Sequence, residues 1–163
     1  MKTRYMGNQA IIRYPDDTEE TIVVSSNHLA EAVEVINTNN FKKVSIESSY
    51  RKADVDFLEY CSNIEGLHIS NSSITNFEGL KYLKNLRMLS LNVKQTSKID
   101  IGQLVRLNQL NGGIPTQITG LVSLSHLTRV ELFGYKPISK SLLELSVIPN
   151  LEALTISQGN LES

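Results

Sequence analysis

The residue types that can carry nucleophilic or metal chemistry are few and scattered in this sequence. Cys61 is the only cysteine, and the three histidines, His28, His68 and His126, stand far apart along the chain. A catalytic or metal site needs such side chains to converge with acids at suitable spacings, and none of these residues has a spacing of that kind. We therefore expect no catalytic residue, no metal site and no cofactor, and we interpret the histidines as surface or capping residues.

Phosphate binding and disulfide chemistry are also disfavoured. The pair Gly112-Gly113 lacks the lysine and the further glycine of a phosphate-binding loop, and we interpret it as a turn. A lone cysteine cannot form a disulfide within the chain, which is typical of a reducing compartment. Because Cys61 stands beside an apolar helical turn, we expect it to be a small buried hydrophobic residue.

Composition and charge narrow the classes of partner. The 163 residues include 16 basic and 17 acidic side chains and have a formal net charge of −1, so the basic surface that neutralises phosphates is missing and nucleic-acid binding is disfavoured. The first ten residues are polar and lack the apolar stretch of a signal peptide. The longest uncharged run, between Arg106 and Arg129, contains too many polar residues to favour a membrane span. We expect a cytoplasmic protein that binds no membrane.

One apolar pattern recurs along most of the chain. It consists of an apolar residue, two intervening residues, a second apolar residue, one intervening residue and a third apolar residue. Successive copies start at a nearly constant spacing of roughly 20 to 24 residues, which is typical of a repeat protein. The copies are Phe41, Val44, Ile46; Ile64, Leu67, Ile69; Leu86, Leu89, Leu91; Leu107, Leu110, Gly112; Leu127, Val130, Leu132; and Leu151, Leu154, Ile156.

This pattern predicts short strands that stack side by side. The last two apolar positions are two residues apart, so they share one face of a strand, and stacked repeats bury that face against their neighbours. Apolar residues three apart in the second halves, such as Phe77, Leu80 and Leu83, indicate a helical turn that returns the chain. The predicted parallel strands are 44–47, 67–70, 89–92, 130–133 and 154–157.

The fourth repeat is the predicted weak point. Gly112 occupies its third apolar place and buries no side chain, and glycine loses more backbone freedom on folding than other residues. We expect at most a weak strand near residue 110, with Asn111-Gly112-Gly113 as a loop or a broken strand.

These residues resemble the leucine-rich-repeat family, especially its short bacterial repeats of about 22 residues, with positions 64–83 as the best match. The resemblance covers about positions 41–163. It implies an α/β solenoid with a parallel sheet on the concave face and short helices or turns on the convex face. In this family an asparagine or cysteine after the strand bonds to free backbone groups. Here the corresponding place holds Ser72, Lys94, Tyr135 and Gly159, and of these Ser72 is suited to the task.

Residues 1–40 follow another pattern. Apolar-rich strands over 10–14 and 21–25 flank a turn with Pro15, Asp16 and Asp17, which predicts a hairpin. Ser26 and Asn27 are expected to cap a helix whose buried side carries Leu29, Ala32, Val33 and Ile36, and a further helical turn is expected over 54–60. We therefore divide the chain into an N-terminal cap, 1–40, and about six repeats, 41–163, the last incomplete.

The C-terminal end has no equivalent cap. Leu151, Leu154, Ile156 and Leu161 are expected at an uncovered end of the solenoid. We expect either that the natural protein is longer or that another chain covers this end.

Function is then expected on the exposed face of the sheet, because strand positions that alternate with the buried leucines point outward. Most of these residues are polar and typical of a solvated surface. Phe133 and Met88 are exceptions, and an aromatic residue beside Arg129 and Glu131 is typical of a binding hot spot, unless Phe133 turns into the edge of the core. The predicted partner-binding residues are Met88, Arg129, Glu131, Phe133, His68 and Asn92.

The resemblance implies a non-enzymatic protein–protein interaction module, because most leucine-rich-repeat domains act by binding. A small, cysteine-poor chain with its own N-terminal cap and irregular repeats also looks like an immunity protein that neutralises a bacterial toxin. The alternative is the N-terminal part of a larger leucine-rich-repeat scaffold or adhesion protein. The sequence indicates no oligomeric state.

Overall fold

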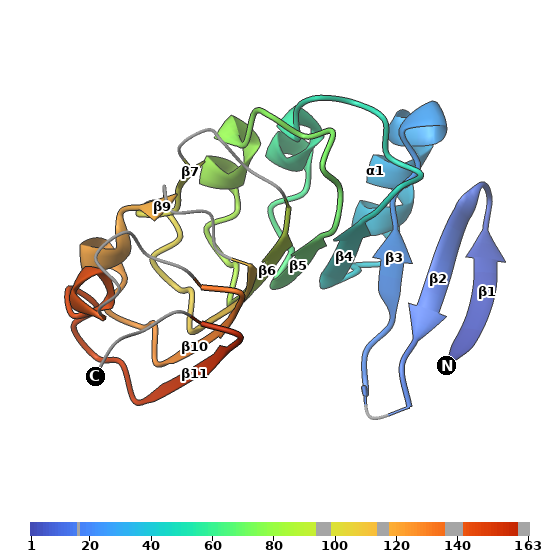
Figure 1. Cartoon of the computed structure of the whole chain (residues 1–163). Helices are drawn as coiled ribbons and strands as arrows, with labels where there is room; N and C mark the ends of the chain where they lie inside the picture. The colour runs from blue at the N-terminus through green and yellow to red at the C-terminus, as the bar shows by residue number, and fades with distance from the viewer. Residues whose placement is uncertain (16, 94–98, 114–117, 136–141, 160–163) are drawn as a thin grey trace.

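One continuous nine-stranded sheet runs through the molecule. The computed structural model describes residues 1–15, 17–93, 99–113, 118–135 and 142–159. The sheet lines one side of the molecule and the short helices lie along the other, as Figure 1 shows. In spatial order the strands are β1 (Lys2–Met6), β2 (Gln9–Arg13), β3 (Thr21–Val23), β4 (Lys43–Ile46), β5 (Gly66–Ile69), β6 (Met88–Asn92), β8 (Gln109–Gly113), β10 (Arg129–Phe133) and β11 (Ala153–Ser157).

The strands from β3 to β11 pair in parallel, as the repeat predicts. Their apolar rows are in register, so that Leu67 lies between Val44 and Leu89. Leu67 and Leu89 are fully buried and Leu132 is almost fully buried, which confirms the predicted core positions. The strands start about one residue earlier than the apolar pattern alone indicates, because an outward-facing residue such as Gly66 also joins the ladder.

Single turns of 3₁₀-helix return the chain behind the sheet. In this helix residues three apart lie on one face, which suits the three-residue spacing of the apolar side chains. Leu80 and Leu83, for example, are completely buried. A second small sheet joins two neighbouring returns through β7 (Ile99–Asp100) and β9 (Ile118–Thr119). The helical turns are η2 (Asp56–Tyr60), η3 (Glu78–Tyr82), η4 (Leu121–Ser123) and η5 (Leu143–Leu145).

The N-terminal strands continue the same sheet. The predicted hairpin is formed by β2 and β3, which place Ile11 beside Ile22 in antiparallel register, and β3 pairs with the first repeat strand β4. The structure adds β1, antiparallel to β2, which the sequence analysis missed. Four of its five residues are exposed, so no apolar alternation marks this edge strand in the sequence.

The helix of this region is α1 (Leu29–Thr38), preceded by the 3₁₀ turn η1 (Ser26–His28). It buries Ala32 and Ile36, while Leu29 and Val33 pack against the core and stay partly exposed. The apolar face predicted from the sequence is therefore confirmed.

The predicted capping of this helix by Ser26 and Asn27 is wrong. The N-cap residues of η1 and α1 are Ser25 and His28, and neither makes a side-chain cap hydrogen bond. The Ser26 hydroxyl instead accepts a hydrogen bond from the Arg51 backbone N–H at 3.0 Å.

The fully buried Gln9 holds this turn in place. Its side chain accepts a hydrogen bond from the Ser25 N–H at 2.9 Å and donates one to the His28 carbonyl at 3.2 Å. A long-range side chain therefore fixes the two ends of the turn that leads into α1.

The expectation of a loop or broken strand at Asn111-Gly112-Gly113 is also wrong. Strand β8 has five residues and pairs in parallel with both β6 and β10. Gly112 joins these ladders with a φ of 119°, and a Cβ atom there would lie 2.0 Å from the Leu91 carbonyl oxygen. Glycine is thus required for a close approach of two strands, which is a different role from the strand break expected from its missing side chain.

The turn after the second repeat strand uses Asn71 and not Ser72. Asn71 is buried, whereas Ser72 is exposed. The Asn71 amide donates to the backbone carbonyls of Glu47, at 2.9 Å, and Tyr50, and its oxygen accepts from the Ser73 N–H at 2.9 Å. Of the other residues considered for this place, Tyr135 is buried, Gly159 is exposed and Lys94 lies outside the described residues.

At the C-terminal side of the sheet, Leu151, Leu154 and Ile156 are only partly buried. The corresponding residues of the preceding repeat, Val130 and Leu132, are almost completely buried because β11 covers them. Leu161, also expected at this end, lies outside the described residues.

Candidate partner-binding surface

The face of the sheet that points away from the core, here called the concave face, carries the predicted site residues in ordered rows. Strand pairing aligns Met88, Gln109 and Arg129 in one row. The next row contains His68, Ser90, Asn111 and Glu131. The register derived from the repeat therefore places these side chains on the expected face.

Arg129, Glu131 and Phe133 form an exposed part of this face on β10. They alternate along β10 with the buried Val130 and Leu132, and all three are exposed. The Phe133 side chain is 59% exposed, so the alternative in which it turns into the edge of the core is wrong. An aromatic ring on a rigid strand, with a carboxylate and a guanidinium at the two preceding outward positions, offers apolar area together with directional hydrogen bonds.

The other predicted residues lie on β5 and β6. Met88 is half-buried, His68 is half-buried and Asn92 is exposed. The His68 Nδ1 and Ser90 Oγ atoms lie 3.1 Å apart across the two strands, so the imidazole is oriented by a neighbour within the sheet. Strand β8 separates this group from β10. With neighbouring strands about 4.8 Å apart, β6 lies about 10 Å from β10 and β5 about 14 Å from it.

Gln109 and Asn111 of β8 lie between these two groups and were not among the predicted site residues. The Gln109 amide donates a hydrogen bond to the Asn111 side-chain oxygen at 3.2 Å. Their outward positions follow from the alternation within the repeat. With Asn111, the row from His68 through Ser90 to Glu131 forms a continuous polar strip across four strands.

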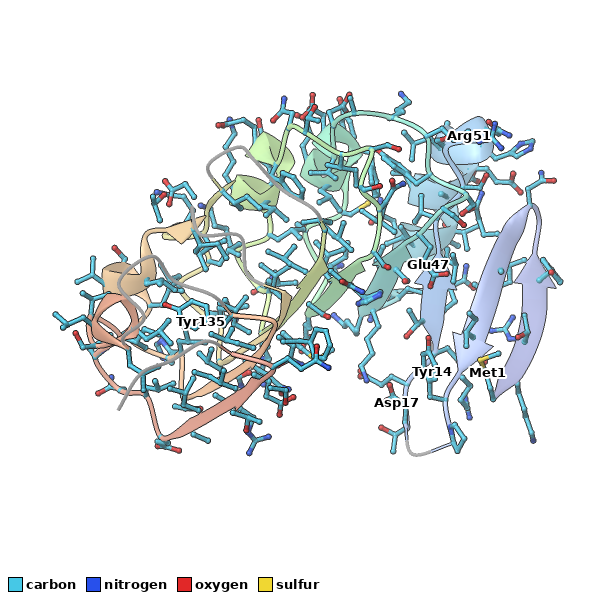
Figure 2. The ribbon with its side chains drawn as sticks, in the orientation of Figure 1. Met1, Tyr14, Asp17, Glu47, Arg51 and Tyr135 are labelled. Atoms are coloured by element: carbon cyan, nitrogen blue, oxygen red, sulfur yellow. The ribbon has the colours of Figure 1, made fainter. Side chains whose placement is uncertain are left out.

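Charged residues on β4 and on β10, toward opposite ends of the concave face, differ in whether they form ion pairs. The Lys43 ammonium lies 2.5 and 2.6 Å from the two carboxylate oxygens of Asp17, and Figure 2 shows Asp17 at the β2–β3 turn. This hydrogen bond, aided by the charge of Lys43, lowers the pKa of Asp17. Among the described residues, Arg129 and Glu131 have no ion-pair partner, so their charges are available to another molecule.

The residues considered for catalysis remain apart in the structure. Cys61 is completely buried, and burial raises the pKa of its thiol to about 11, as expected for a small core residue. Within the described ranges, no group of three or more histidine, cysteine and acidic side chains is arranged to hold a metal ion. The described helices are all too short or too polar to cross a membrane.

Parallel strands that recur about every 20 to 24 residues, apolar rows on one face and helical turns on the return define an α/β leucine-rich-repeat solenoid. Among solved structures, the chain is similar to an internalin from Listeria monocytogenes, with a TM-score of 0.55 and 16% sequence identity over 79% of this chain and 38% of the internalin. The chain thus spans little more than a third of that protein. No family model and no curated protein matches the sequence. The likeness to the internalin concerns the fold.

Proposed function

We propose that this chain is a non-enzymatic protein-binding module of the cytoplasm that recognises a protein partner on its concave face. The observation that carries the proposal is the exposed set Arg129, Glu131 and Phe133 on one strand. Aromatic and arginine side chains dominate the energy of protein interfaces. Most other outward positions of the sheet carry small or polar side chains, which suit the rim of such an interface.

Rigidity of the strand supports the same proposal. Strand β10 is paired on both sides, with β8 and β11, so its backbone loses little freedom when a partner binds. Residues 1–40 act in this proposal as the cap of the solenoid: their hairpin extends the sheet beyond β4, and α1 covers the apolar residues behind it.

Site-specific crosslinking tests where the partner binds. A photoreactive amino acid replaces Phe133 in one variant and Val122, which is 68% exposed on η4, in a matched control. The proposal expects one specific crosslinked protein from the Phe133 position and none from the Val122 position. A product of equal yield at both positions, or only at Val122, would place the binding surface elsewhere.

A sharper version of the proposal identifies the partner as a bacterial toxin that this chain neutralises. It rests on the small size of the chain, its single cysteine and its irregular repeats. Co-expression with the product of the neighbouring gene tests it: the chain should restore growth, and the Phe133→Ala, Arg129→Ala variant should not. If that product is toxic and the chain does not neutralise it, or if the product is harmless, the toxin version is excluded. The general proposal of a protein-binding module is unaffected by either outcome.

The alternative function is that of a segment of a larger scaffold or adhesion protein with the same fold. The two proposals separate when the length of the natural protein is determined by immunoblotting of the native cell. A product much longer than 163 residues would favour the scaffold.

A further inference from the structure

A groove opens on the helical side of the molecule, between α1 and η2, away from the concave face. Its volume is about 670 Å³. Leu29 and Val33 of α1 form one side, and Phe57 and Tyr60 of η2 form the other. Figure 1 shows α1 standing behind the first repeat strands.

The two sides of the groove are firmly joined. The Asn37 side-chain amide, at the end of α1, donates a 2.9 Å hydrogen bond to the Tyr60 carbonyl at the end of η2. Beneath the groove, Phe57 packs against the Tyr50 ring with centroids 5.7 Å apart, and the Tyr50 hydroxyl donates to the Asp54 carbonyl at 2.7 Å. The groove is therefore a preformed feature of the first repeat.

Its rim is acidic. Asp54, Asp56 and Glu59 line the groove, against one cation, Lys52. In the described part of the chain these three carboxylates form no ion pair, whereas Asp17 and Glu65, for example, pair with lysine or arginine. Burial raises the pKa of the Tyr50 hydroxyl most, and the negative charges of Asp54 and Asp56 raise it further. The two carboxylates therefore make the surroundings of Tyr50 electrostatically negative.

In the next repeat a lysine occupies the position that has no cation in the groove. In η3, Lys81 pairs with Glu78 at 3.4 Å and its ammonium lies 5.3 Å from the centre of the Tyr82 ring. One repeat earlier, Asp56 and Tyr60 occupy the places of Glu78 and Tyr82. Glu59 stands where Lys81 would supply the cation. Tyr60 is 63% exposed, so its ring can receive a cation from outside.

We propose that this groove binds a segment of a protein partner in which a lysine or arginine stands beside an apolar side chain. The apolar side chain fills the space between Val33 and Phe57. The cation takes the position that Lys81 holds in the next repeat, between the carboxylate of Asp56 and the Tyr60 ring. The groove shares no residue with the concave face. An experiment that rejects binding in the groove therefore leaves the concave-face proposal untouched, and the reverse also holds.

Model peptides test the chemistry of the partner. The probe is a short fluorescein-labelled peptide that alternates lysine and leucine, and its binding to the full chain is followed by fluorescence anisotropy. A matched peptide with glutamate for lysine and one with serine for leucine should each bind at least about tenfold more weakly, and binding of the probe should weaken with added salt. Equal binding of either matched peptide would overturn the proposal.

Variants locate the binding. Glu59→Lys supplies the missing cation internally, and Ala30→Arg places a long cationic side chain in the groove from an exposed position of α1. Each should weaken probe binding about tenfold or more. Glu152→Lys, the same charge reversal at an exposed carboxylate beside β11, should leave it unchanged. Native affinity in both folded groove variants, or equal loss in Glu152→Lys, would overturn the proposal; should one groove variant fail to fold, the other decides.

Sedimentation velocity excludes another occupant. The proposal expects a monomer without the probe, with or without Ala30→Arg. A dimer that the Ala30→Arg change dissociates would place a second copy of this chain in the groove and overturn the proposal.

Discussion

The Asn71 side-chain amide donates a 2.9 Å hydrogen bond to the backbone carbonyl of Glu47, one repeat earlier in the stack. The same amide also bonds the Tyr50 carbonyl, and its oxygen accepts from the Ser73 N–H. One buried side chain thus satisfies backbone groups of two adjacent turns. Such groups are costly when buried without a partner.

Asn71→Ala should therefore destabilise the protein more than most surface changes. It removes the partner of the Tyr50 carbonyl and of the Ser73 N–H, whereas the Glu47 carbonyl keeps a bond from the Tyr50 N–H. We expect a loss of about 1–3 kcal/mol in the free energy of unfolding. Urea denaturation followed by circular dichroism measures it. Ser72→Ala, at the neighbouring exposed position, should change stability by less than about 0.5 kcal/mol; a larger loss for Ser72→Ala than for Asn71→Ala would contradict the assignment.

Leu89→Ala tests the buried row of the sheet. Leu89 is completely buried between Leu67 and Leu110, so its truncation should cost roughly 2–5 kcal/mol through lost transfer energy and a cavity. His68→Ala and Ser90→Ala, on the opposite face, should each cost about 0.5 kcal/mol or less. The denaturant midpoints of the three variants rank these effects, and the reverse order would refute the register.

Gly112→Ala tests the close approach of β8 to β6. The added Cβ would lie 2.0 Å from the Leu91 carbonyl oxygen, at a φ that L-residues rarely adopt. We expect a loss above about 2 kcal/mol. Gly134→Ala is the matched control, because Gly134 has a positive φ of 66° but nothing within 4 Å of its Cβ position; it should cost only about 1 kcal/mol of backbone strain.

The same strand should be well protected against amide exchange. Because β8 pairs on both sides, amide exchange of Leu110 should be about as slow as that of Leu89. Exchange at Leu110 that is much faster than at Leu89, measured by nuclear magnetic resonance in D₂O, would indicate local opening and restore the idea of a weak fourth repeat.

Acid should weaken the link between the hairpin turn and β4. The hydrogen bond from Lys43 lowers the pKa of Asp17 from 3.8 in the native state. The ion pair is therefore fully effective above that pH and is lost as the pH falls through the lower native pKa. Asp17→Asn should reduce stability near neutral pH and flatten its decline below about pH 4. Parallel losses in the native protein and the variant at every pH would contradict the expected linkage.

The concave-face proposal predicts a defined loss of affinity. Once a partner is identified, Phe133→Ala with Arg129→Ala should weaken binding by at least about tenfold, or about 1.4 kcal/mol. Because both side chains are exposed, the melting temperature should change little. Isothermal titration calorimetry measures the affinity, and an unchanged value would move the site away from β10.

The sequence predicts the repeat strands because burial has a simple period. Every second residue of β10 must be apolar when one face covers the core, and Val130 and Leu132 follow that rule. The same alternation assigns Arg129, Glu131 and Phe133 to the exposed face. These features depend on local pattern alone.

Long-range contacts account for what the sequence did not reveal. The role of Gly112 depends on the approach of Leu91, and that of Gln9 on a turn beyond the next strand of the hairpin. Asn71 replaces Ser72 because its amide reaches carbonyls of the preceding repeat. The groove beside Tyr60 became visible only when α1 and η2 were placed side by side. Each depends on tertiary neighbours that no single segment specifies.

The partial burial of Leu154 and Ile156 in β11 has a mechanical consequence. Each coil contacts only its neighbours, so under a pulling force the coils should detach one by one, each releasing about 22 residues of chain. Among the described coils, the β11 coil has a neighbour on one side of the sheet only, and of these coils it should detach first. The molecule would then lengthen stepwise from its C-terminal side, while the antiparallel strands β1 and β2 keep the first coil closed longest.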